Sequence, residues 1–250
     1  MAGERRPGLI LQHGVDAPPA LLAEWAVSRG LEHEVHPVWR EPLPPDPARY
    51  GWIATLGSEH TPGHDAAPAW VDAEIEFLRR ALELELPVLG LCFGGQALAI
   101  AAGGSVAPSE PPQIGWYEVS TDDPALVPPG PWLHYHYDQL SPPPGAEVVA
   151  RAAAGPSAFA IGRSLGLQFH PESTVEIGGA WARMDAEQLE RRGIEPAFEA
   201  APETASADAM RLFDAWWDLA GGSEPGRMGT LSKIGGQADG HAPPDPRRST

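Results

Sequence analysis

The amino-acid sequence predicts an α/β fold, built as an open, mostly parallel sheet flanked by helices. Short apolar runs alternate with stretches of helical periodicity between residues 8 and 102, which is the pattern of a parallel sheet covered by helices. The run at residues 87–91 is apolar throughout, as in a strand buried on both faces. With 250 residues, of which 42% are hydrophobic, the chain is long enough to bury a large core.

The first half of the chain supplies this alternation. Its expected strands are residues 8–13, 32–39, 51–56 and 87–91, and its expected helices are residues 18–29, which Gly30 ends, and 70–86. One face of the second helix is apolar and consists of Val71, Ile75, Leu78 and Leu82. We expect the acidic residues of this segment to form its solvent-exposed side, namely Glu74, Glu76, Glu83 and Glu85.

After Gly103 the pattern changes to short strands separated by turns that are rich in proline and glycine. The expected strands are residues 116–120, 132–137, 147–152, 158–162 and 165–169, and the expected helices are residues 175–192 and 206–220. Residues 221–250 offer little to bury, so we expect a disordered tail there. Residues 1–220 are then expected to form one domain.

The composition excludes several classes of function. A net charge of −17 disfavours binding to nucleic acids and to anionic membranes, which need basic surfaces. No apolar run reaches the roughly 18 residues of a membrane span, and no secretion signal is recognisable, so we expect a cytoplasmic protein. Cys92 is the single cysteine, which excludes an intramolecular disulfide and a zinc site made of several cysteines.

The residues around Cys92 favour a nucleophile over a buried apolar thiol. Cys92 lies in Gly-Leu-Cys-Phe-Gly-Gly-Gln at residues 90–96, between the expected strand and an expected helix at residues 97–102. Small residues on both sides of a nucleophile permit the sharp strand-to-helix turn that is called a nucleophile elbow. The helix N-terminus favours the thiolate, and the amide of Phe93 is placed to bind an oxyanion.

A thiolate nucleophile needs a base, and Gln-Phe-His-Pro-Glu at residues 168–172 supplies one at the end of an expected strand. His170 would take the proton of Cys92, and Glu172 would hold the imidazole in the required tautomer. The plain alternative for His170 is a surface His-Pro turn, which the cysteine elbow in the same chain disfavours.

Two histidine pairs have spacings that could hold a metal ion, His60 with His64 and His134 with His136. No cysteine or acidic partner completes either site in the sequence, so we expect no metal ion and no cofactor. The tryptophans on expected helices are interpreted as packing residues: Trp25, Trp70, Trp181, Trp216 and Trp217.

Together, the motifs at residues 90–96 and 168–172 resemble those of the class I, or triad, glutamine amidotransferases. The likeness is to stand-alone proteins similar to the glutaminase domain of GMP synthase. It covers about residues 8–192 and includes Ile-Gly-Trp-Tyr at 114–117 and His-Tyr-Asp at 136–138. The resemblance implies a flavodoxin-like open sheet, with the elbow at the carboxyl ends of its strands, where such sheets bind ligands.

The resemblance also implies roles for residues. Cys92 would attack the glutamine side chain, and the amides of Gly57 and Phe93 would hold the oxyanion. The bound glutamine would be contacted by Gln96, His136, Tyr137 and Asp138. The chain departs from the family pattern in the loop at residues 56–59, at Gln113, where glutamate is usual, and at Tyr137, where a small residue is common. These departures concern the specificity of the amide pocket.

Three functions remain open at this point. The first is a glutaminase that supplies ammonia to an acceptor or to a separate synthetase. The second keeps the triad but hydrolyses a γ-glutamyl peptide or amide, and the altered loop at residues 58–64 is where such a substrate would differ. The third is a non-catalytic regulatory protein that binds a partner, which the complete set of Cys92, His170 and Glu172 disfavours.

Overall fold

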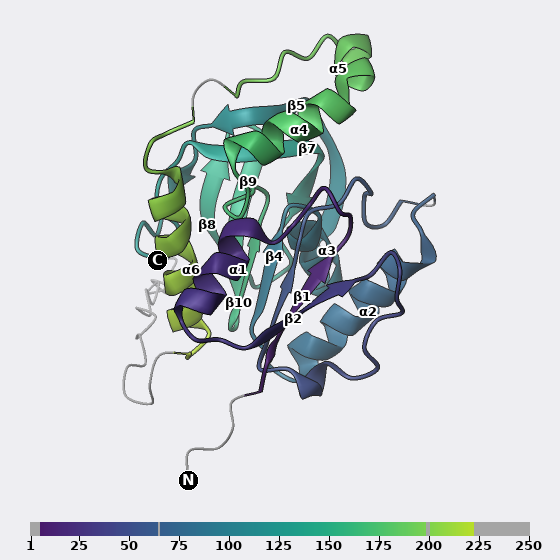
Figure 1. The fold of residues 1–250 in the computed structure, drawn as a ribbon, viewed down its shortest axis with the longest axis vertical. Helices are drawn as coiled ribbons and strands as arrows, with labels where there is room; N and C mark the ends of the chain where they lie inside the picture. The colour runs from purple at the N-terminus through teal and green to yellow at the C-terminus, as the bar shows by residue number, and fades with distance from the viewer. Residues whose placement is uncertain (1–5, 65, 199–200, 223–250) are drawn as a thin grey trace, which may run out of the picture.

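The computed structural model describes residues 6–64, 66–198 and 201–222, and an eight-stranded sheet lies at its centre (Figure 1). In order across the sheet, the strands are β2 (His33–Pro37), β1 (Gly8–Gln12), β3 (Trp52–Thr55), β4 (Val88–Leu91), β10 (Ser164–Leu167), β9 (Gly155–Ile161), β8 (Glu147–Ala152) and β6 (Ser120–Thr121). The strands from β2 to β10 pair in parallel, and β9, β8 and β6 add an antiparallel edge. The predicted open, mostly parallel α/β sheet is confirmed.

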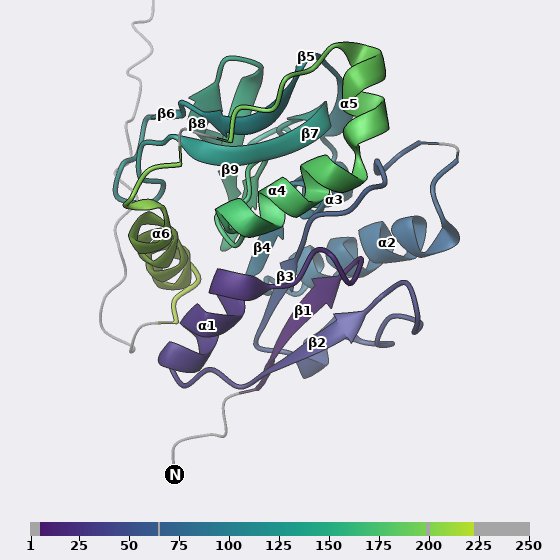
Figure 2. The same cartoon turned by 45° about the horizontal axis from the view of Figure 1, so that its top comes forward.

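Helices cover both faces of this sheet (Figures 1 and 2). One face carries α1 (Ala20–Ser28) and α6 (Ala205–Leu219), and the other carries α2 (Ala69–Glu83) and α3 (Phe93–Ala101). Successive side chains of β1 point to opposite faces of the sheet. Ile10 packs in the cluster with α1 and α6, while its neighbours Leu9 and Leu11 pack with α2 and α3. The strands in the middle of the sheet are therefore apolar on both sides, as the sequence predicts.

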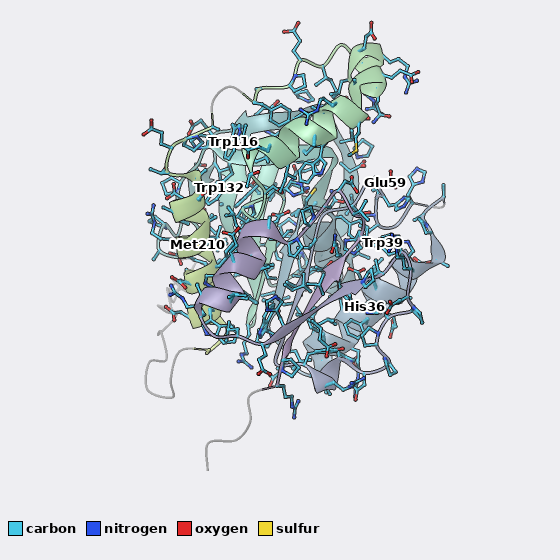
Figure 3. The ribbon with its side chains drawn as sticks, in the orientation of Figure 1. His36, Trp39, Glu59, Trp116, Trp132 and Met210 are labelled. Carbon is cyan, nitrogen blue, oxygen red and sulfur yellow. The ribbon has the colours of Figure 1, made fainter. Side chains whose placement is uncertain are left out.

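A smaller layer lies over the carboxyl end of the sheet. It consists of the antiparallel pair β5 (Ser105–Tyr117) and β7 (Trp132–Ser141), with α4 (Val175–Met184) and α5 (Ala186–Arg192) beside it (Figure 2). Figure 3 shows Trp116 and Trp132 on this pair of strands, on the side toward α6, which carries Met210. Trp116, Leu133 and Trp181 form the small apolar cluster that joins α4 to the two strands. A short 3-10 turn, η1 (Pro47–Arg49), precedes β3.

Two expectations about elements are corrected. The strand expected at residues 116–120 is instead the end of β5, which runs from Ser105 to Tyr117. Its first part has no strand pattern in the sequence, because prolines break the apolar alternation and interrupt the pairing with β7 between Pro108 and Gln113. The single helix expected at residues 175–192 is two helices that meet at Asp185. Gly30, the expected helix stop, does follow α1 and has a φ of +64°.

The acidic side of α2 is also corrected. Glu76, Glu83 and Glu85 are exposed as expected, but Glu74 is fully buried, with 0% of its surface exposed. It bonds with two polar side chains that are far away in the sequence, so helical periodicity alone could not place it.

Two expectations from the sequence concern the C-terminal tail and membrane-spanning segments. The predicted tail at residues 221–250 lies outside the described residues, apart from Gly221 and Gly222. Among the described residues, no helix has the length and apolar character needed to cross a membrane.

Candidate functional site

Cys92 sits at the turn between β4 and α3, with φ +51° and ψ −106°. This conformation is strained for a residue with a side chain and is the one expected of a nucleophile elbow. Neighbouring glycines make the turn possible, because a Cβ on Gly90 would lie 2.4 Å from the carbonyl oxygen of Gly94, and one on Gly94 would lie 2.0 Å from that of Thr55. The predicted strand-to-helix turn is present.

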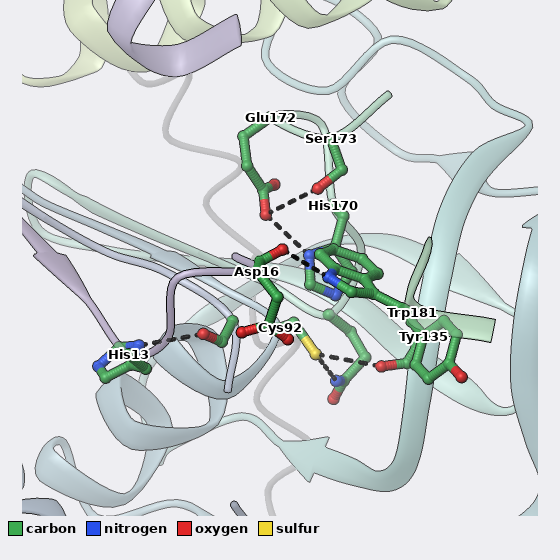
Figure 4. Close-up of polar contacts among 10 residues, drawn as sticks. His13, Asp16, Cys92, Tyr135, His170, Glu172, Ser173 and Trp181 are labelled. Carbon is green, nitrogen blue, oxygen red and sulfur yellow. Dashed lines mark hydrogen bonds and ion pairs between the residues drawn. The ribbon is translucent and has the colours of Figure 1, made fainter. Parts of the chain in front are cut away.

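His170 and Glu172 follow β10, the strand that pairs with β4. The ring nitrogen Nδ1 of His170 lies 2.8 Å from Oε1 of Glu172 and donates to it (Figure 4), and Cys92 is close enough to act electrostatically on the same ring. All three side chains are buried, with 2% to 5% of their surface exposed. The residues predicted as a triad are thus brought together in the order cysteine, histidine, carboxylate.

The charges of this group favour a protonated His170. Burial lowers the pKa of His170, but the neighbouring charges of Cys92 and Glu172 outweigh it and raise the pKa to about 10. Two nearby histidines behave in the opposite way: burial, together with the charge of His170, lowers the pKa of His136 to about 3 and that of His134 well below its ordinary value. At neutral pH the site therefore holds one imidazolium beside two neutral imidazoles.

The two residues predicted to bind the oxyanion line the same cavity as Cys92. Phe93 is the first residue of α3, and amides in the first turn of a helix have no partner within it. Gly57 lies against His170, since a Cβ there would be 2.6 Å from Cε1 of the ring. The amide of Gly94 donates to the carbonyl of Leu56 over 3.0 Å, which orients the peptide group that carries the Gly57 amide.

The cavity lined by Cys92 has a volume of about 430 Å³. Its lining includes the residues predicted to contact the substrate: Gln96, His136, Tyr137 and Asp138. Gln96 is held in place, because its Nε2 donates to the backbone oxygen of Asp138 over 2.9 Å. Asp138 in turn accepts from the Thr61 hydroxyl over 2.7 Å, which ties β7 to the loop between β3 and α2. The predicted contacts therefore share one wall.

Several lining residues were not found by sequence reasoning. Asp185 accepts from the hydroxyl groups of Tyr135, over 3.2 Å, and of Tyr137, and Arg192 lies over the Tyr137 ring. The unusual Tyr137 is thus anchored to the junction of α4 and α5. Trp181 was interpreted as a packing residue, yet its ring also contacts His170 and its indole nitrogen donates to the backbone oxygen of Asp16 over 2.8 Å (Figure 4). Trp181 and Asp16 are 165 residues apart, and Asp185 is 50 and 48 residues from Tyr135 and Tyr137, so no local sequence pattern could place these contacts.

The structure shows the contacts of three of the four candidate metal-binding histidines, His60, His134 and His136. Nδ1 of His134 lies 3.0 Å from Nε2 of His136, and both rings are buried. His60 contacts the ring of Trp70 and lies near the exposed Glu59, which Figure 3 shows on the loop between β3 and α2. Within the described ranges, no group of three or more potential ligands could hold a metal ion.

Comparison with known families bears on the same residues. A family model described as glutamine amidotransferase class-I matches residues 60–182, which contain Cys92, His170 and Glu172. The chain carries a class I glutamine amidotransferase domain. This amidotransferase domain is 38% identical over 112 residues to a glutamine-hydrolysing GMP synthase of Aeropyrum pernix, a match of 41% of this chain and 22% of that enzyme. The matched part is thus about a fifth of the length of the relative.

Two further similarities cover most of the length of the protein with which this chain is compared. One relative from Ignicoccus hospitalis, named as a single subunit of a glutamine-hydrolysing GMP synthase, is 27% identical over 158 residues, which is 58% of this chain and 81% of that relative. The solved structure of a glutamine amidotransferase from Methylobacillus flagellatus superimposes with a TM-score of 0.77 and 23% identity, over 86% of this chain and 96% of the other. That structure supports the fold of the amidotransferase domain.

Proposed function

We propose that this amidotransferase domain hydrolyses the side-chain amide of glutamine through a thioester on Cys92 and supplies the ammonia to an acceptor. The observation that carries the proposal is that Cys92 and His170 line one cavity of about 430 Å³, while Glu172 is hydrogen-bonded to His170. A thiol, a base and a group that orients the base are the parts that covalent acyl transfer requires.

In the proposed reaction, the Cys92 thiolate attacks the amide carbon of bound glutamine, and the amides of Gly57 and Phe93 bind the oxyanion that forms. The intermediate then collapses as His170 gives its proton to the nitrogen, so ammonia leaves and a γ-glutamyl thioester remains on the sulfur. Neutral His170 next takes a proton from a water molecule, which attacks the thioester carbon. Cleavage of the carbon–sulfur bond releases glutamate and restores the thiolate beside the imidazolium.

The remaining parts of the proposal concern the substrate and the acceptor. Gln96, His136, Tyr137 and Asp138 are proposed to contact glutamine, since all line the cavity beside Cys92. The relative from Ignicoccus hospitalis is named as one subunit of a synthase, which supports a separate protein partner as the acceptor of ammonia. We place both proteins in the cytoplasm.

A second candidate is hydrolysis of a γ-glutamyl amide or peptide by the same triad. The loop in which the chain departs from the family pattern lines the cavity with Ser58, Glu59, His60 and Thr61, so it would meet a larger leaving group. The described lining also includes the carboxylates of Asp16, Glu59, Asp138 and Asp185 but no lysine or arginine. Such a wall would favour a leaving amine that carries an additional positive charge.

A substrate panel tests these proposals. Purified protein should release glutamate from glutamine, and the rates should be compared with those for γ-glutamyl amides of neutral and of cationic amines. Faster turnover of a γ-glutamyl amide would favour the second candidate. Absence of turnover on every substrate, with formation of a partner complex that persists in a Cys92→Ala variant, would favour a regulatory binding protein instead.

The raised pKa of His170 predicts selective alkylation of Cys92 at neutral pH. Because the ring keeps its proton up to about pH 10, the sulfur has a cation beside it at neutral pH, and a neighbouring cation increases the reactivity of a cysteine. Iodoacetamide should therefore modify Cys92 at pH 7 nearly as fast as at pH 9, measured by mass spectrometry. A His170→Gln variant should react slowly at pH 7 and approach the wild-type rate only at alkaline pH. Reaction of wild-type protein at alkaline pH only would contradict the prediction.

A further inference from the structure

A buried polar pair at the edge of the site, formed by Glu74 and the cavity-lining His13, is not used by the proposed reaction. Glu74 of α2 is fully buried, and its Oε2 lies 2.8 Å from Nε2 of His13, which follows β1. Its other oxygen, Oε1, accepts from the hydroxyl of Thr55 over 2.5 Å. Burying a carboxylate is costly unless it is paired and hydrogen-bonded, and here both oxygens are satisfied.

His13 connects this pair to the loop that carries Gly57. Its Nδ1 lies 3.1 Å from the carbonyl oxygen of Gly57, the contact drawn as a dashed line from His13 in Figure 4. A carbonyl only accepts, so Nδ1 carries the hydrogen and donates it, while Nε2 shares a proton with Glu74. Glu74 therefore fixes the orientation of the His13 ring, as an outer carboxylate does for a metal-binding or catalytic histidine.

The same ring also contacts the second residue of the predicted oxyanion site. The centroid of the His13 ring lies 4.7 Å from that of Phe93, and the ring also stacks on Trp70 at 5.1 Å. One side chain thus contacts both residues whose amides are proposed to bind the oxyanion.

We propose that His13, oriented by Glu74, is a positioning residue that keeps the amides of Gly57 and Phe93 aimed at one point. This inference rests on the proposed function. Gly57 has no side chain to hold it, so its orientation depends on hydrogen bonds of its own backbone and on the fixed neighbours of its loop. The oxyanion exists only in the transition state and the intermediate, so loosening these amides lowers kcat and leaves KM nearly unchanged.

Variants of Glu74 test the proposal through glutamate release from the substrate that the wild-type protein prefers. Glu74→Ala should lower kcat by about 10- to 100-fold, less than complete loss of an oxyanion donor, with KM within about threefold. Glu74→Gln should recover most of kcat, because its amide nitrogen can donate to His13 and its oxygen can accept from Thr55. The matched control is Glu76→Ala, an exposed residue on the same helix, which should leave kcat unchanged.

A second variant keeps the test decisive if Glu74→Ala does not fold. His13→Phe combined with Glu74→Leu replaces the polar pair with apolar side chains of similar size, a change that often preserves stability. It keeps the ring against Phe93 but removes the hydrogen bond to Gly57. We expect the same loss of kcat, while the rate of Cys92 alkylation at pH 7 stays within about twofold, because alkylation needs the thiolate and no oxyanion site.

The possible results distinguish failure of this proposal from failure of the proposed function. Unchanged kcat in the folded variants would overturn the proposal, and so would a parallel loss of kcat, alkylation rate and thermal midpoint that Glu74→Gln does not relieve, since that pattern indicates a purely structural role. A wild-type protein without turnover on any γ-glutamyl substrate would instead refute the proposed function, a result obtained before any variant is compared.

Discussion

Replacing Cys92 with alanine is expected to lower glutamate release from glutamine by about 10⁴-fold or more. The sulfur is the atom that forms the thioester, and no other cysteine is present in the sequence to replace it. Alanine is a suitable substitute because it retains the side-chain carbon at a position with φ +51°, so the backbone conformation changes less than it would with glycine. Equal turnover by the wild type and by Cys92→Ala would refute the covalent mechanism.

The same variant has a second readout, which does not depend on turnover. The charge of Cys92 is the largest of the effects that raise the pKa of His170, so the pKa should fall below its value of about 10 when the sulfur is removed. Titration of the His170 ring by NMR in the two proteins measures this change directly. A pKa that stays the same in both would mean that the thiolate and the imidazolium do not interact.

The parallel half of the fold follows from the sequence because its cause is local. Strands such as Val88–Leu91 are buried on both faces and so read as continuous apolar runs, while the intervening helices show a single apolar face. β5 lacks such a signal, because Pro108 and Pro111 interrupt the alternation that its pairing with β7 would otherwise produce. Its register depends on pairing with β7 and not on a pattern within β5 itself.

The same contrast holds at the site. Cys92, His170 and Glu172 can be found from two short motifs, because elbow geometry and the step from histidine to carboxylate require particular residues at fixed spacing. Glu74 could not be assigned, because its helix places it at the border of the apolar face and its partner His13 lies 61 residues earlier in the sequence. Charge alone predicted exposure, whereas long-range hydrogen bonds determined its burial.

Glu172→Gln is expected to lower kcat for glutamine by about 10²- to 10⁴-fold, the range seen when the acid of such a triad is neutralised. Oε1 accepts from His170, whereas Oε2 is buried and has no hydrogen-bond partner among the described residues. Glutamine must therefore either turn its amide nitrogen toward His170, which disrupts the tautomer, or bury that nitrogen without an acceptor, at a cost of about 1–3 kcal/mol.

The pH profile of this variant distinguishes loss of orientation from misfolding. Glu172 helps to raise the pKa of His170 to about 10, so removing its charge lowers that pKa. His170 must be protonated to release ammonia, and activity is lost as the pH rises through its pKa; the alkaline limb should therefore move to lower pH in Glu172→Gln. The matched control is Glu176→Gln, which removes the same charge from an exposed position at the start of α4 and should leave both kcat and the limb in place. An unshifted limb in Glu172→Gln, together with wild-type kcat, would show that the carboxylate does not act on His170.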